Sequence, residues 1–140
     1  MSNERKYRER PERPKALVCG MLEDNGRYLF LIKKDQHGVE RYEFPWVYAT
    51  EGGDPVSQIA QAFKMQSGIS VQVGEIELEA RHNAGSRRKK YWVQCYVFRV
   101  SAKEKKADPG SGYSGFKWLS LKDAKKKKLG RHAEWLLRME

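Results

Sequence analysis

Long hydrophobic runs are missing from this sequence, and cysteine is scarce. The 140 residues include 2 Cys and 5 Pro, and the longest purely apolar stretches are about the size of Tyr28 to Ile32. The amino-terminal residues 1–15 combine charge with proline, where a signal peptide would need an apolar segment. A membrane-spanning helix would need about 20 apolar residues. We therefore expect neither secretion by a signal peptide nor a membrane span, and we place the protein in the cytoplasm.

The two cysteines are isolated from each other and from histidine. Cys19 and Cys95 lie in separate apolar segments, without a CxxC pair or a histidine at ligand spacing. This pattern favours buried structural thiols in a reducing compartment over a disulfide or a zinc site. The chain is long enough for one domain with a real core, and it contains no internal repeat.

Acidic residues are few in one part of the chain, and basic residues gather there. Between Arg87 and Arg131 there are 15 Lys or Arg against 3 acidic residues, a local balance of +12. The three clusters are Arg87, Arg88, Lys89 and Lys90; Lys103, Lys105 and Lys106; and Lys125, Lys126, Lys127 and Lys128. Such a positive field attracts phosphate backbones. We predict that the clusters bind RNA or a ribonucleoprotein, with a merely solubilising surface as the alternative.

Residues 1–14 and 15–140 differ in organisation. The first segment alternates charge without apolar periodicity and contains two prolines, so we predict a flexible basic arm. In the second, apolar runs over 16–22 and 27–33 flank Asn25-Gly26, the sequence typical of a tight hairpin turn. A strand over 42–48 comes next. A helix over 55–67 follows, capped by Asp54 at its start and ended by Gly68.

The remainder of the chain alternates strands with short helices. Residues 71–82 predict a strand with one buried and one acidic face, because Ile76, Leu78 and Ala80 alternate with glutamates. Residues 91–100 predict a central strand and 116–119 a short one. Helices are expected over 121–128 and 131–139, the second with an apolar strip of Ala133, Leu136 and Leu137. The order of elements predicts an α+β fold on a mixed sheet.

Residues 42–69, which read YEFPWVYATEGGDPVSQIAQAFKMQSGI, resemble without a gap the Nudix box, the metal and pyrophosphate motif of a large hydrolase family. The likeness extends to the hairpin from Ala16, to the strand over 91–100 and to WLSLKDA at 118–124. The resemblance implies a Nudix-like α/β/α sandwich. In that family the last segment is a Trp-containing strand that leads into a short helix.

The acidic residues that the family uses are absent from this box. Two family glycines are replaced by Trp46 and Val47, the first glutamate by Gly53, the Arg-Glu pair by Gln61 and Ala62, and the double glutamate by Met65 and Gln66. Mg²⁺ prefers carboxylate and water oxygens, and amides alone hold it poorly. The resemblance therefore implies a degenerate box with no metal site, no catalytic residue and no cofactor, hence a catalytically inactive protein.

The sequence is also compatible with other functions. Carboxylates outside the box, with Glu51, Glu77 and Glu79 as candidates, would make the chain a Mg²⁺-dependent pyrophosphohydrolase of a nucleoside diphosphate derivative or an RNA cap. Solvent-facing roles account for the same acidic residues. A nucleotide ligand and a protein-interaction adaptor are further alternatives.

Three histidines and one tryptophan complete the set of candidate residues. His37, His82 and His132 have no ligand spacing and are expected on loops or on the surface. Trp46 is the aromatic residue most suited to contact a ligand, or else to plug the pocket of the resembled fold. Trp118 and Trp135 are expected to pack in the core.

Overall fold

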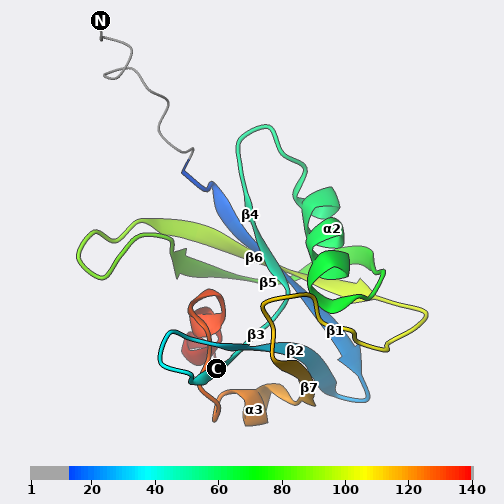
Figure 1. Ribbon diagram of the computed structural model, residues 1–140. Helices are drawn as coiled ribbons and strands as arrows, with labels where there is room; N and C mark the ends of the chain where they lie inside the picture. The colour runs from blue at the N-terminus through cyan, green and yellow to red at the C-terminus, as the bar shows by residue number, and fades with distance from the viewer. Residues whose placement is uncertain (1–12, 140) are drawn as a thin grey trace, which may run out of the picture.

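Strand β1 (Ala16–Asp24) lies at the centre of the protein, and its first seven residues are all buried. The structure, a computed structural model, describes residues 13–139 (Figure 1). The predicted arm over 1–14 therefore lies almost wholly outside the described residues. No helix among the described residues is long and apolar enough to cross a membrane.

A mixed sheet surrounds β1. Its strands within the described residues run in the order β3-β2-β1-β6-β5, while β4 pairs with β1 and β7 with β2. The bounds are β2 (Arg27–Lys34), β3 (Glu40–Glu43), β4 (Trp46–Ala49), β5 (Gln72–Asn83), β6 (Trp92–Ser101) and β7 (Gly115–Leu119). β1 and β6 are parallel, and the other pairs are antiparallel. The prediction that residues 91–100 form a central strand is confirmed.

Each face of the sheet carries its own hydrophobic core. Helix α2 (Pro55–Ser67) covers one face with Ile59, Ala62 and Phe63. The 3-10 helix η1 (Arg131–Arg138) and the short helix α3 (Leu121–Ala124) lie against the other face. The two cores use alternate residues of β1, because successive side chains of a strand point to opposite faces. The predicted α/β/α sandwich on a mixed sheet is therefore confirmed.

The local signals read from the sequence are found where they were expected. Asn25 and Gly26 have φ of 55° and 78° in the β1–β2 turn, the left-handed conformations of a type I′ hairpin. Asp54 accepts a hydrogen bond from the Val56 amide at 3.1 Å at the start of α2. Gly68 ends the helix with φ of 78°. Cys19 and Cys95 are buried and free.

The predicted strand over 42–48 is wrong, because the structure divides it in two. β3 pairs with β2, whereas β4 pairs with β1, and Phe44 and Pro45 turn the chain between them. Proline has no amide hydrogen for a continuous ladder. Its carbonyl still accepts from the Gly20 amide at 3.0 Å.

The two C-terminal helices also differ from the prediction. α3 ends at Ala124, since the Lys128 carbonyl and the Gly130 amide instead hydrogen bond the two backbone groups of Tyr42. The segment 131–138 is a 3-10 helix, in which residues three apart lie on one side. Ala133 and Leu136 are accordingly buried together with Trp135, whereas the Leu137 of the predicted strip is 56% exposed.

The prediction of one buried face on β5 is only partly met. β5 is an edge strand with irregular register between Val73 and Leu78. Ile76 is consequently 45% exposed, while Leu78 and Ala80 are half-buried.

Candidate functional site

Helix α2 offers no carboxylate along its whole length. Of the residues at the degenerate box positions, Gln61 and Met65 are exposed, the latter by 76%, and Ala62 is buried in the core. Val47 packs on the same core from β4. A Cβ added to Gly53 would lie 2.4 Å from the Gln58 amide nitrogen. The donors on this face are amides and a thioether, which do not fit Mg²⁺.

Gln66 has a structural task on α2. Its amide oxygen accepts from the Trp46 backbone amide at 3.0 Å, and its amide nitrogen donates to the Trp46 carbonyl at 2.7 Å. The side chain therefore completes the backbone hydrogen bonding of β4. A carboxylate could accept the first bond but could not donate the second.

Four rings form a cluster beyond β4. Trp46 stacks on His132, with ring centroids 3.5 Å apart and an interplanar angle of 11°. Tyr48 meets both rings edge-on. The Tyr48 hydroxyl lies 2.7 Å from His82 Nε2. The rings come from β4, the end of β5 and η1, so the fold alone brings them together.

The prediction that the histidines lie on loops or the surface holds for His37 but is wrong for His82, and His132 lies partly buried in η1. His82 is 3% exposed. Burial, and then the charges of His132, Arg131 and Arg138, lower the pKa of His82 from 6.5 to about 4. His82 is therefore neutral at pH 7. The sequence held a sign of this burial, since His82 continues the alternation of Leu78 and Ala80 on β5.

Glu43, a buried carboxylate that is not among the candidates predicted from the sequence, lies beside the ring cluster. It is 6% exposed, and its Oε2 is 3.1 Å from His132 Nδ1 and 3.4 Å from the His132 amide. A Cβ on Gly130 would lie 2.4 Å from Glu43 Cγ. Glu43 thus binds the first turn of η1 against β3, and Gly130 provides the space for it.

Trp46, Glu43 and His132 border a cleft of about 420 Å³, which we name the His132 cleft. Its wall carries five basic residues, Lys33, Lys34, Arg41, Arg87 and Arg131, against three acidic ones, Asp35, Glu43 and Glu134. Asp35 is neutralised by Arg41 at 3.1 Å. The cleft therefore combines an aromatic surface with an excess of positive charge.

A second cavity of about 480 Å³, which we name the Trp92 pocket, adjoins the first. The two share Arg87, Arg131 and Glu134. Arg131 donates to the carbonyls of Asn83, at 3.1 Å, and Gly85. It thereby fastens the β5–β6 loop to η1, which Figure 1 shows below that loop.

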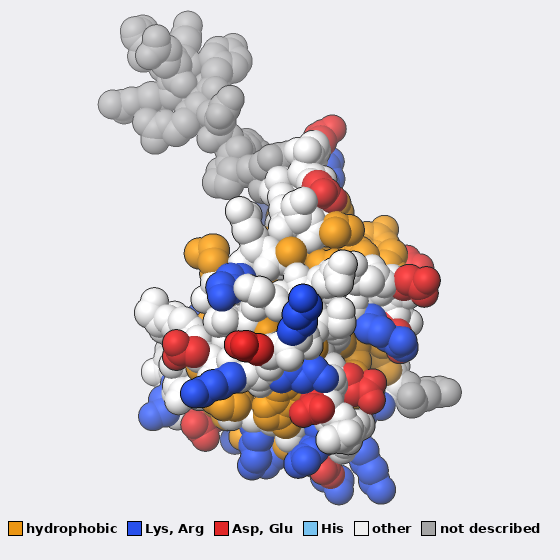
Figure 2. All heavy atoms as spheres, turned by 90° about the vertical axis from the view of Figure 1, so that its right-hand side faces the viewer, with side chains coloured by type: hydrophobic (Ala, Val, Ile, Leu, Met, Phe, Trp, Pro, Cys, Tyr) orange, Lys and Arg blue, Asp and Glu red, His pale blue; other side chains and the backbone are white. Residues whose placement is uncertain are grey.

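The three predicted basic clusters lie in different places. Arg87, Arg88, Lys89 and Lys90 form the β5–β6 loop beside the two cavities, whereas Lys103, Lys105 and Lys106 follow the opposite end of β6. Lys125 to Lys128 follow α3, and Lys126 pairs with Asp123 of that helix at 3.9 Å. Lys127 is 5.7 Å from the Tyr42 ring of β3. On the face in Figure 2, basic and acidic side chains are interspersed.

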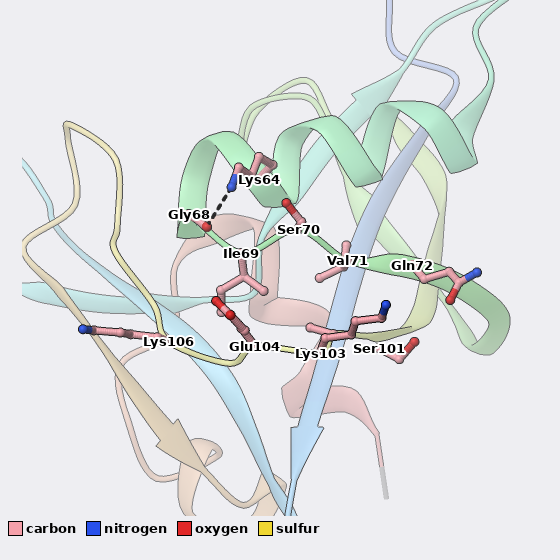
Figure 3. Close-up of a pocket in the computed structure, with 11 residues that line it drawn as sticks. Lys64, Gly68, Ile69, Ser70, Val71, Gln72, Ser101, Lys103, Glu104 and Lys106 are labelled. Carbon is pink, nitrogen blue, oxygen red and sulfur yellow. Dashed lines mark hydrogen bonds between the residues drawn. The ribbon is translucent and has the colours of Figure 1, made fainter.

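A larger cavity of about 620 Å³ lies at the end of α2, beside Lys64, Lys103 and Lys106. In Figure 3 Lys106 extends away from Lys103, and Lys64 donates to the Gly68 carbonyl at 3.2 Å. These positive charges do not converge on one point. The larger volume alone therefore does not make this cavity a better candidate site than the His132 cleft.

The substitute carboxylates considered from sequence are also dispersed. Glu77 pairs with Arg99 at 2.7 Å, while Glu79 accepts from Gln94 at 3.1 Å. Their partners Gln94 and Arg99 point to opposite faces of β6, because they are an odd number of residues apart. Glu77 and Glu79 are therefore held on opposite faces of the sheet. Glu51 lies 3.8 Å from Lys15, before α2. Within residues 13–139, no group of three or more His, Cys, Asp or Glu is placed to hold a metal ion.

Comparison with known proteins shows the fold. No family model matches the sequence. No curated protein matches it either. Among solved structures, an ADP-ribose pyrophosphatase from Streptococcus suis has a TM-score of 0.64 at 15% identity, covering 89% of this chain and 87% of that one.

Two further structures give the same result. A C. elegans Ap4A hydrolase has a TM-score of 0.61 at 16% identity, covering 88% of this chain and 90% of that one. The NUDIX domain of Shewanella oneidensis NrtR, solved with ADP ribose, has a TM-score of 0.60 at 14% identity, covering 99% and 96%. The chain therefore has the fold of the Nudix hydrolases. Its helix α2 carries no carboxylate.

Proposed function

We propose that this chain is a non-catalytic Nudix-fold protein that binds single-stranded RNA in the His132 cleft. The observation that carries the proposal is the stacked pair of Trp46 and His132, which lines a cleft where basic residues outnumber acidic ones. This cleft lies next to a helix without acidic ligands. Aromatic rings stack unpaired bases, and neighbouring Lys and Arg neutralise phosphates. Of the box positions, Val47 and Ala62 meanwhile serve packing and Gln66 serves backbone hydrogen bonds.

The positions of the clusters refine this proposal. Arg87 and Lys90 border the cavities, so the β5–β6 loop is the expected main phosphate contact. The cluster from Lys103 to Lys106 lies at the far end of β6 and is expected to contribute only through the long-range field. The basic segment over 1–14 is proposed as an auxiliary contact.

The test is fluorescence anisotropy with single-stranded RNA, duplex RNA and single-stranded DNA over a salt series, with Mg²⁺ and with EDTA. We expect binding that favours the single strands, needs no Mg²⁺ and weakens steeply with salt. The triple substitution R87A/K89A/K90A should reduce the salt slope by up to roughly 2, at about 0.7 per phosphate contact.

A matched variant, K103A/K105A/K106A, removes the same charge from the other end of β6. It should keep most of the affinity of the wild type. A flat salt dependence in the wild type would contradict the proposal, and equal losses in the two triple variants would show that the β5–β6 loop is not the main contact.

A pyrophosphohydrolase activity is the second candidate, favoured by the pair of buried Glu43 and partly buried His132 inside the cleft. This carboxylate and imidazole could move a proton for an attacking water. The test is turnover of nucleoside diphosphate derivatives and capped RNA with Mg²⁺ or Mn²⁺, in the wild type and in E43Q. Turnover that E43Q abolishes would establish this candidate, while a wild type without turnover on the whole panel would end it.

A further inference from the structure

Trp92, the first residue of β6, is a large aromatic side chain that the two cores do not use. It is 42% exposed and does not belong to the core on either face of the sheet. A single exposed aromatic residue is ordinary on a protein surface, so only the groups around the ring can point to a ligand. The surroundings of Trp92 are therefore informative.

Two guanidinium groups lie near the Trp92 ring. Arg81 Cζ is 5.2 Å and Arg138 Cζ 5.7 Å from the ring centroid, both within the range of cation–π contacts. Arg138 also donates to the Arg81 carbonyl, which fixes it beside the ring. Two positive charges therefore lie over the indole ring.

The Trp92 pocket also has an excess of cations. Arg87, Lys90, Arg131 and Arg138 line it, against the single carboxylate of Glu134. Its volume of about 480 Å³ and that of the His132 cleft, about 420 Å³, both fall within the roughly 300 to 1,000 Å³ of small-ligand sites. Arg87, Arg131 and Glu134 line both cavities, so the boundary between the cavities carries two basic residues against one acidic one.

An exposed aromatic ring with guanidinium groups at about 5 to 6 Å from its centroid suits a nucleobase with its flanking phosphates. A duplex keeps its bases stacked on one another and would leave the Trp92 face unused. An acidic peptide would satisfy the cations but would not require the ring. The combination therefore favours a single-stranded nucleic acid.

We propose that Trp92 forms a second base-stacking site, so that a single strand crosses the Arg87–Arg131 boundary and occupies both cavities. This inference rests on the proposed RNA binding and extends it. It sets the ligand as an oligonucleotide of at least two nucleotides, rather than a mononucleotide.

The experiment compares the affinities of a nucleoside monophosphate and of RNAs of 2, 4 and 8 nucleotides for the wild type, W92A and W92F. The control variant is F116A, because Phe116 on β7 is also aromatic and 41% exposed. We expect W92A to weaken binding of the 8-mer about 5- to 100-fold, as loss of one stacked base does. W92F should retain most of the affinity, F116A should leave it unchanged, and binding of the monophosphate should not respond to W92A.

Each outcome bears on a definite claim. If the wild type does not bind the 8-mer, the proposed function itself fails. If it binds the 8-mer but W92A binds equally well, or if the monophosphate binds as tightly as the 8-mer, only the second site is overturned. A polyglutamate peptide whose binding depends on Trp92 as strongly would overturn the base-stacking assignment. Quenching of tryptophan fluorescence by the 8-mer, reduced in W92F, checks the site in a variant that keeps an aromatic ring.

Discussion

The side-chain amide of Gln66 hydrogen bonds both backbone groups of Trp46, accepting from the amide at 3.0 Å and donating to the carbonyl at 2.7 Å. This pair joins the last turn of α2 to the first residue of β4. It also holds the backbone that aims the Trp46 ring at His132. The residue at this position therefore needs a donor and an acceptor, which an amide has and a carboxylate lacks.

Replacing Gln66 by glutamate should destabilise the protein by about 1 to 3 kcal/mol, because the Trp46 carbonyl loses its donor and faces a negative charge. Urea denaturation at pH 7 measures the change. Met65→Glu is the matched control, since Met65 is 76% exposed and a surface substitution should stay within about 0.5 kcal/mol. Equal effects of the two variants would show that the amide pair contributes nothing.

Among the three substitutions that restore a family glutamate on α2, Ala62→Glu should destabilise the protein most. Ala62 is 8% exposed and packs on the core beneath α2, so a carboxylate there would be buried without a partner. We expect a loss of about 2 kcal/mol or more. A thermal unfolding series of A62E, M65E and Q66E tests the order, and a stable A62E would show that α2 can shift to expose this position.

Stability should fall between pH 6.5 and about 4 because of His82. Its pKa in the folded protein is lowered to about 4 from 6.5, chiefly by burial, so over this range the unfolded state binds the proton more readily. The contribution of neutral His82 to the free energy of unfolding is complete above pH 6.5 and is lost as the pH falls toward 4. Its upper limit is roughly 3 kcal/mol.

The check is the free energy of unfolding against pH for the wild type and for His82→Gln. The variant should show a shallower decline over this interval, whatever its stability at pH 7. His37→Gln, at an exposed position of the β2–β3 turn, should keep the wild-type decline. If the free energy of unfolding of His82→Gln fell with pH as steeply as that of the wild type, the loss of stability would come from other groups.

Asp54→Ala should cost about 1 kcal/mol, because the carboxylate accepts from the Val56 amide at the start of α2. Asp54→Asn should restore most of this stability, since the amide oxygen can also cap a helix. Thermal unfolding of both variants gives the comparison. A loss in Asp54→Asn as large as in Asp54→Ala would point to the charge rather than the cap.

Arg131→Lys should loosen the β5–β6 loop while keeping the charge. The guanidinium donates to the carbonyls of Asn83 and Gly85, whereas an ammonium group cannot present the same planar fork. Hydrogen exchange should become faster at the Ser86 and Lys89 amides, which are hydrogen bonded within the loop. Arg88→Lys, a change at an exposed position of the same loop, is the control and should leave the exchange unchanged.

Much of the fold could be predicted because its signals are local. Asn25-Gly26 sets the first hairpin, Asp54 and Gly68 bound α2, and the apolar residues of that helix recur at helical spacing. Each of these depends on the conformation of a few neighbouring residues. The division at Pro45 and the early end of α3 were missed because both depend on backbone partners distant in the sequence, on β1 and on β3.

The sequence by itself determined the layered fold and the lack of carboxylates on α2, since apolar periodicity and residue identity are both properties of the chain alone. Only the tertiary structure decided what the box positions do and where the candidate site lies. Tyr48 and His82 are 34 positions apart, and Glu43 and His132 are 89 apart. Burial lowers the pKa of His82, and the same packing stacks His132 on Trp46. Such proximity arises from strand order and helix docking, which no local pattern encodes.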